Sequence, residues 1–148
     1  MYRSVGDKLI DVTKRHAVEI SEQWCQAVQK NPRTPSYHSM ETDRCVIYAM
    51  EFYRNIGLMY FSEKPYEEIH QFFRKYAENQ FNDGIPLEEA IYALIMIRRH
   101  IWLNAELQAV FITALDQHQA VEGINRTIRI FDQAIYIVIQ HYEHLRRK

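Results

Sequence analysis

The fold class is decided by the stretch QAVEGINRTIRIFDQAIYIVIQHYEHLR, residues 119–146. Seven apolar residues recur in it at alternating spacings of four and three: Ile124, Ile128, Phe131, Ile135, Val138, Tyr142 and Leu145. This period places the seven side chains in one seam along a single long helix. A half-buried strand would alternate at every second residue, and that pattern is seen nowhere in the chain. The stretch therefore predicts a helix whose apolar seam faces a core.

Loop signals divide the preceding sequence into four more helical segments. They fall at residues 31–36, 62–65 and 82–86, with a weaker signal at 116–118. Gly84 suits the left-handed position just past a helix end, and Pro86 suits the first turn of the next helix. Ser39 is a suitable N-cap. The predicted helices span residues 4–30, 39–61, 65–82, and 86 to as far as 115.

Short loops between long helices require largely antiparallel packing. We therefore expect a single all-α domain, residues 1–148, built as a bundle of about five long amphipathic helices. A globin-like arrangement without haem is the competing topology. The second segment is apolar on more than one face, so it is either central in the bundle or covered by a partner.

Composition excludes several classes of protein. The 148 residues carry 18 Lys and Arg against 19 Asp and Glu, so the chain lacks the basic surface that nucleic-acid binding needs. No apolar run reaches the ~18–20 residues of a membrane span. Cys25 and Cys45 lie among apolar neighbours and no signal peptide is visible, so we expect reduced core thiols in a cytoplasmic protein.

Motifs of catalysis and metal binding are sparse. The chain has no glycine-rich phosphate loop and no G-x-S-x-G elbow. Glu67-x-x-His70 is only half of a di-iron motif, and His70 is expected to face solvent. His141 and His144 have a spacing that zinc could use, but we expect a solvated pair at a helix end instead. We predict no catalytic residue, no metal and no cofactor.

Two other histidines carry the alternative hypothesis of a haem- or small-ligand-binding sensor. His16 lies on the apolar stripe of the first predicted helix, where it is either a hydrogen-bonded core histidine, a haem ligand or a pH-sensitive group. His100 lies off the main seam of its helix and could ligate haem in a globin-like fold.

Charged residues on predicted inner faces are the most informative group. Arg98 and Asp132 are each in register with apolar residues of their own helix, and Arg99 flanks the same face. Because an unpaired buried charge is costly, we predict that Asp132 pairs with Arg98 or Arg99. The pair either fixes helix register or, with Trp102, lines a polar pocket for a small anion. Tyr37, in the long loop after the first helix, is expected to cover the bundle end as a lid or plug.

These residues also carry a family resemblance. The elements in order are Trp24, Asn31-Pro32-Arg33-Thr34 with Tyr37, then residues 83–89, then Arg98-Arg99-His100-Ile101-Trp102, then Phe131-Asp132. Together they resemble the RsbRD-type N-terminal domain of RsbT co-antagonists and other bacterial regulators, over roughly residues 9–142. The resemblance implies a helical signal-input domain, related to globin-like dimers that lack haem, rather than an enzyme. Members usually carry an output domain such as a STAS domain, and none follows Lys148, so the chain is either a free-standing relative or an excised input domain.

The leading hypothesis is a non-catalytic signalling input or interaction domain that forms a homodimer. Three observations support it. The second predicted helix is apolar on more than one face, the last helix has a wide apolar face, and catalytic motifs are lacking. A signalling protein or an output domain would be its further partner.

Overall fold

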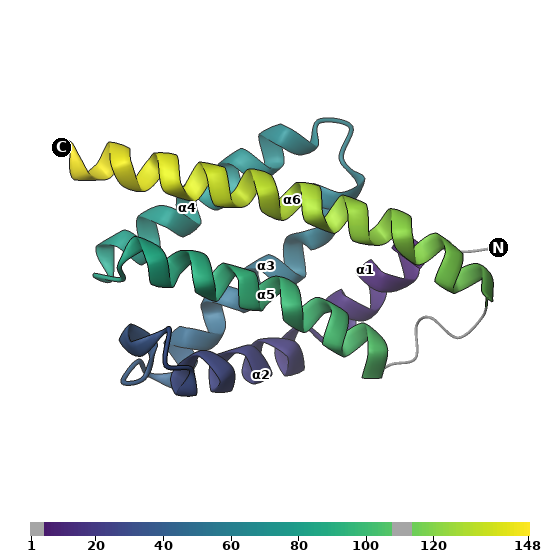
Figure 1. The fold of residues 1–148 in the computed structure, drawn as a ribbon, viewed down its shortest axis with the longest axis horizontal. Helices are drawn as coiled ribbons and strands as arrows, with labels where there is room; N and C mark the ends of the chain where they lie inside the picture. Colours follow the sequence, from purple (N-terminus) through teal and green to yellow (C-terminus); the bar gives the residue numbers. More distant parts are fainter. Residues whose placement is uncertain (1–4, 108–113) are drawn as a thin grey trace.

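The computed structural model describes residues 5–107 and 114–148, and this part of the chain is all-helical with no strand (Figure 1). The predicted all-α bundle is confirmed. The elements are α1 (Val5–Arg15), α2 (Ala17–Lys30), the short 3₁₀ helix η1 (Pro35–Tyr37), α3 (Thr42–Phe61), α4 (Pro65–Asn82), α5 (Leu87–Leu107) and α6 (Ala114–Arg146). Within the described helices, none is long and apolar enough to cross a bilayer.

The first predicted helix is two helices that meet at a bend. His16 has φ −105° and ψ 22°, which ends α1 and begins α2. No proline or glycine marks this position in the sequence. Both helices contact α3 and α5, and the bend lets α1 pack on α6 as well. Tertiary packing therefore sets this break, and the prediction of one continuous helix over residues 4–30 was wrong.

The other helix boundaries follow the loop signals to different degrees. α4 has the predicted bounds, and Gly84 adopts the expected left-handed conformation with φ 76°. The predicted N-cap, Ser39, was wrong, because the cap of α3 is Glu41 and it makes no side-chain capping bond. α6 begins at Ala114 and includes the weak loop signal at 116–118. Residues 108–113, into which the fourth predicted helix could have extended, lie outside the described residues.

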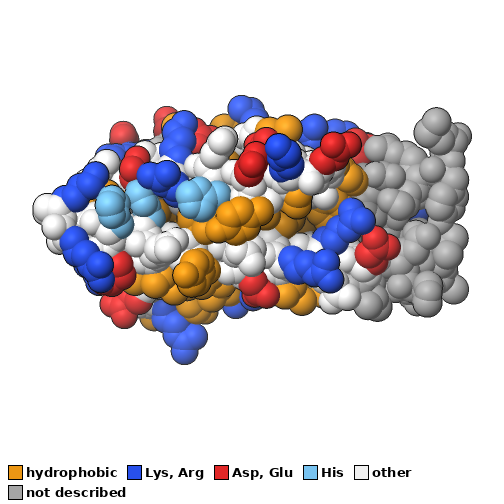
Figure 2. Space-filling view, turned by 90° about the horizontal axis from the view of Figure 1, so that it is seen from above, with side chains coloured by type: hydrophobic (Ala, Val, Ile, Leu, Met, Phe, Trp, Pro, Cys, Tyr) orange, Lys and Arg blue, Asp and Glu red, His pale blue; other side chains and the backbone are white. Residues whose placement is uncertain are grey.

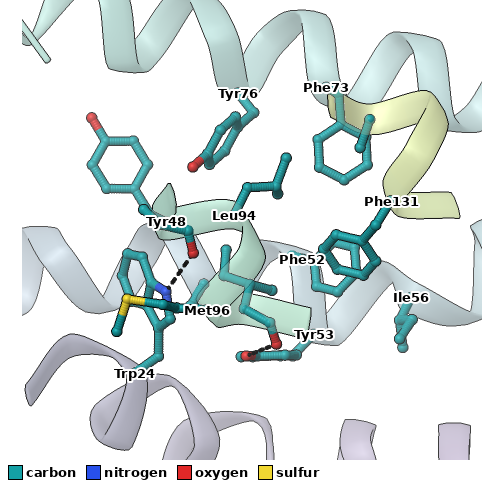
Figure 3. Close-up of a cluster of buried hydrophobic side chains, with 14 of the residues drawn as sticks. Trp24, Tyr48, Phe52, Tyr53, Ile56, Phe73, Tyr76, Leu94, Met96 and Phe131 are labelled. Carbon is teal, nitrogen blue, oxygen red and sulfur yellow. Dashed lines mark hydrogen bonds between the residues drawn. The ribbon is translucent and has the colours of Figure 1, made fainter. Parts of the chain in front are cut away.

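Helix α5 runs through the centre of the fold and is held there by aromatic donors. Three side chains on three other helices donate hydrogen bonds to its backbone carbonyls: Trp24 on α2 to Ala93 (2.9 Å), Tyr53 on α3 to Ile97 (2.8 Å) and Tyr76 on α4 to Ala90 (3.1 Å). Figure 3 shows the Trp24 and Tyr53 bonds reaching α5 from different sides. Each bond satisfies a buried polar group that would otherwise destabilise the core.

Helix α3 buries most of its apolar surface inside the protomer. Its Phe52 lies in a cluster of rings, 5.9 Å from Phe73 on α4 and 5.3 Å from Phe131 on α6 (Figure 3). Residues on both sides of the helix, including Tyr48 and Tyr53, are buried. The sequence left two alternatives for this helix, which is apolar on more than one face: a central position in the bundle or a surface covered by a partner. The structure shows the central position.

Tyr37 closes one end of the bundle as a plug. Its side chain is fully buried, and its hydroxyl donates a 2.6 Å hydrogen bond to Oε1 of Gln80 on α4. Its ring meets that of Trp24 edge-on at 5.9 Å. The backbone N–H and the hydroxyl of Ser36 both donate to the buried carboxylate of Glu89, each at 2.7 Å. The loop is thus tied to α4 and α5, and it positions the start of α5.

Candidate functional site

Four of the five predicted site residues lie on α5 and α6, two helices that pack against each other at the front of Figure 1. Arg98 and Trp102 are half-buried, whereas Arg99 and Asp132 are exposed. The prediction that these charges lie on inner faces was therefore wrong for Arg99 and Asp132. The structure brings these residues to an outward-facing surface instead of an enclosed pocket.

Arg98 lies at the edge of the core. Its guanidinium carbon is 6.0 Å from the centroid of the Phe131 ring on α6. A cation over an aromatic face is stabilised by ~0.5–1 kcal/mol at such partly exposed sites. The aliphatic stem of Arg98 can cover apolar surface while its charged end reaches solvent. The aromatic ring therefore replaces the acid that we predicted as the partner of this arginine.

The predicted ion pair between Asp132 and Arg98 or Arg99 is not formed. Among the described residues, no salt bridge joins Asp132 to either arginine. The reason is that the buried side of α6 is rotated from the predicted seam. Phe131, Val138 and Tyr142 of that seam are buried, together with a row one residue before it: Gly123, Thr127, Ile130, Ala134, Ile137 and His141.

Because this side of α6 faces the core, a row of apolar residues on the helix is left exposed. Ile124, Ile128 and Ile139 are 40%, 41% and 41% exposed, although all were candidates for burial by hydrophobicity. Ile135, in the same row, is half-buried. At Gly123 the helix lies close to its neighbours: a Cβ added there would be in ordinary van der Waals contact, at 3.7 Å, with the Trp102 ring and the Tyr60 hydroxyl.

Apolar residues of α5 continue this surface. Ile91, Ile95 and Trp102 are all half-buried, and their spacing of four and seven places them on one side of the helix. We define the α5–α6 face by the following residues: Ile91, Ile95, Arg98, Arg99, Trp102, Ile124, Ile128, Asp132, Ile135 and Ile139. It combines exposed and half-buried apolar residues with charges of both signs, and Arg98 and Asp132 lie among the apolar residues of their helices.

A basic group borders this face. The Arg33 guanidinium carbon lies 5.5 Å from the centroid of the Tyr92 ring. Hydrogen bonding to Arg33 and Arg99 lowers the pKa of the Tyr92 hydroxyl below its ordinary value of 10.0. Tyr92 thus links the loop after α2 to the arginine-bearing surface of α5.

Tyr37, the fifth predicted site residue, belongs to the core. Burial raises the pKa of its hydroxyl well above the ordinary value, and neighbouring tyrosines add to the effect. It is a structural plug, not a residue that contacts a ligand on the α5–α6 face.

The histidines of the haem hypothesis have different surroundings. His16 is 26% exposed at the α1–α2 bend, with Nδ1 3.4 Å from the carboxylate of Glu19. His100 is buried, and its Nδ1–H donates to the Met96 carbonyl at 2.8 Å. Burial lowers the pKa of His100 below the ordinary 6.5.

The remaining candidate metal ligands, Glu67, His70, His141 and His144, do not come together as a site either. His70 lies against the ring of Tyr66, with ring centroids 5.9 Å apart, and Glu67 is exposed. The expectation of a solvated histidine pair was wrong for His141, which is buried and bonds Glu78 at 3.0 Å. This bond holds the pKa of the Glu78 carboxyl below its ordinary value. Over the described ranges, no three His, Cys, Asp or Glu residues come together as a metal site.

Sequence analysis missed two groups of polar residues. Gln80 and Glu89 are buried and hold the loop that contains Tyr37. Arg126 and Arg129 line a groove on the opposite flank of α6 from the isoleucine row. Their spacing of three residues indicates a shared flank of the helix, but neither arginine lies within the apolar seam.

No protein-family model matches the sequence, and comparisons with curated proteins and with solved structures gave no significant match. The functional proposal therefore rests on the geometry of the chain and on the resemblance described above.

Proposed function

We propose that this chain is a non-catalytic interaction module of the bacterial signal-input type, and that it acts as a homodimer joined through the α5–α6 face. The observation that carries the proposal is the row of three isoleucines on α6, each about two-fifths exposed. An exposed apolar row of this kind is typical of a surface that another protein covers.

A second copy of the chain is the simplest partner for this surface. Most homodimers have two-fold symmetry, so the same patch meets itself. Two antiparallel helices on each copy would then form a four-helix contact in which isoleucine meets isoleucine. Each Å² of apolar surface removed from water contributes about 25 cal/mol, before the cost of association is subtracted.

The charges of the face suit the same arrangement. Asp132 on α6 and Arg99 on α5 are both exposed and have opposite signs. A two-fold contact can place Asp132 of one copy against Arg99 of the other. The pair that sequence analysis expected within one chain would then be formed between two chains.

The signalling part of the proposal is supported by the resemblance to RsbRD-type input domains. In such an arrangement, the dimer would present its remaining surface to an output domain or a signalling partner in the cytoplasm. The haem alternative gains no support from His16, which lies at the surface with Nδ1 3.4 Å from the Glu19 carboxylate.

The test is the mass of the purified protein in solution. Light scattering coupled to gel filtration at micromolar concentration should give twice the chain mass of 17.8 kDa. The double variant Ile128→Asp/Ile139→Asp should be monomeric, because it buries two carboxylates in the contact. Circular dichroism should show unchanged helicity, since both side chains are exposed in the protomer.

Ile47→Asp is the matched control. Ile47 is 50% exposed on α3, outside the α5–α6 face, so this variant should remain a dimer. A wild-type protein that is monomeric at 100 μM would contradict the proposal. So would a dimer that survives the double substitution, because its contact would then lie elsewhere.

A further inference from the structure

The groove between the α3–α4 turn and α6 has the features of a ligand site. It encloses about 550 Å³, a volume within the range of small-molecule pockets. Its floor is apolar, formed by the buried side chains of Met59, Ile69 and Ile130. Seen from above α6 in Figure 2, orange hydrophobic side chains are exposed between the charged ones on this side of the molecule.

Two exposed aromatic rings border the groove. Phe61 is 49% exposed and Tyr66 is 54% exposed, at the end of α3 and the start of α4. Exposed rings of this size leave a large apolar area in contact with water, and a molecule that covered them would remove this area from water. They are positioned to cover a flat or aliphatic molecule that enters the groove.

Two arginines of α6 line the same groove. Arg126 lies 5.2 Å from the centroid of the Tyr60 ring and forms a 3.0 Å ion pair with Glu122. Arg129, one turn further along, is exposed and has no ion pair with any other described residue. Among the described residues, Glu122 pairs with Arg126 but no acidic side chain lines the groove itself. The polar side of this site therefore attracts an anion, because guanidinium groups bind carboxylates and sulfonates through charge-assisted hydrogen bonds.

We propose that this groove binds a small amphipathic organic anion, with its apolar body on the Met59–Ile69–Ile130 floor and its acid group at Arg126 and Arg129. The proposal does not depend on the dimer, because the arginines lie on the flank of α6 opposite the isoleucine row. If the domain is a signal-input module, such an anion is the class of ligand that it would sense.

The probe is anilinonaphthalene sulfonate, an aromatic anion whose fluorescence rises when it is bound. Phenyl naphthylamine has the same rings without the sulfonate and serves as the neutral counterpart. Titration of the wild-type protein should give one saturable site per chain, with the anion bound roughly tenfold more tightly than the neutral dye. In Arg126→Gln/Arg129→Gln, this preference should disappear while the neutral dye binds as before.

The control removes the same number of charges elsewhere. Arg74→Gln/Arg147→Gln changes two exposed arginines outside the groove and should keep the preference for the anion. Melting curves of both double variants should match the wild type, because none of the four side chains is buried. The monomeric Ile128→Asp/Ile139→Asp protein should bind the anion unchanged, which separates this test from that of the dimer.

Two results would overturn the proposal. One is the absence of saturable binding of the anionic dye, which is the outcome if the groove instead accepts a peptide. The other is an anion preference that persists in Arg126→Gln/Arg129→Gln, since the sulfonate would then be bound elsewhere.

Discussion

His100 is a buried side chain of α5 through which the stability of the fold depends on pH. It is buried on α5, and its Nδ1–H bonds the Met96 carbonyl. Burial lowers its pKa because the charged imidazolium loses water, and the nearby Arg99 charge acts in the same direction. The folded protein therefore holds His100 neutral at a pH at which the unfolded chain would protonate it.

We predict that the His100→Gln variant loses less stability in mild acid than the wild type does. A histidine whose pKa is lower in the folded state binds fewer protons there than in the unfolded chain. Its contribution to stability is complete above the ordinary pKa of 6.5 and is lost as the pH falls through the folded-state pKa. Urea unfolding at pH 7.5 and pH 5.5 measures the difference. An equal loss in both proteins would show that other groups cause the acid sensitivity.

At the scale of residues, sequence analysis found the right side chains more often than their surroundings. It expected Tyr37 to cover the bundle end, and Tyr37 is buried there. It identified Arg98 and Asp132 as unusual charges on apolar helices but placed both inside. Hydrophobicity favours Ile124 and Ile128 over Gly123 and Thr127 as core residues. The structure reverses this order, since Gly123 and Thr127 are buried and Ile124 and Ile128 are exposed.

At the scale of elements, the ends of a helix could be predicted from the sequence wherever a proline or a glycine marks them. α4 was predicted with its exact bounds because Pro65 begins it and Gly84 follows it. The bend at His16 carries no such mark: it lies where α1, which packs on α6 as well as on α3 and α5, meets α2, which packs on α3 and α5. A break that is caused only by packing against neighbouring helices leaves no signal in the local sequence.

The turn after α4 provides a clean test of one local signal. Gly84→Ala should destabilise the protein by about 1 kcal/mol, because Gly84 has φ 76° and a Cβ disfavours this left-handed conformation. Apart from the adjoining residues, no atom lies within 4 Å of where that Cβ would be, so the cost comes from the local backbone and not from a clash with another segment. For a domain of this size, the melting temperature should fall by about 2–4 °C.

Gly84→Asn is the appropriate comparison, since asparagine tolerates the left-handed region better than alanine does. Its melting temperature should lie between those of the wild type and Gly84→Ala. If alanine had no effect, the turn would have to relax to a negative φ in solution.

At the scale of the whole molecule, α6 has two different surfaces. One flank contributes the isoleucine row of the α5–α6 face, and the other contributes Arg126 and Arg129 to the groove. The row between them is buried and packs along α4. A single long helix therefore connects the proposed dimer contact with the proposed ligand site.

The charges at the proposed dimer contact yield a prediction about assembly. Asp132→Arg should weaken the dimer roughly tenfold at low salt, because it would place a second arginine against Arg99 of the other copy. Adding Arg99→Asp to the same chain restores opposite charges across the two-fold axis, so the exchanged variant should recover most of the wild-type affinity. Sedimentation velocity over a dilution series gives the dissociation constants. The difference between the single and exchanged variants should shrink at high salt, because exposed charges are screened.

Glu51→Arg makes the same charge change as Asp132→Arg at an exposed position on α3, and it should leave the dimer unaffected. If the exchanged variant dissociates as readily as Asp132→Arg, then Asp132 and Arg99 do not meet across the contact. A dimer that still depends on Ile128 and Ile139 would then be joined through the apolar row with a different register of the two helices. The charge exchange therefore tests the register of the contact, whereas the isoleucine variants test its existence.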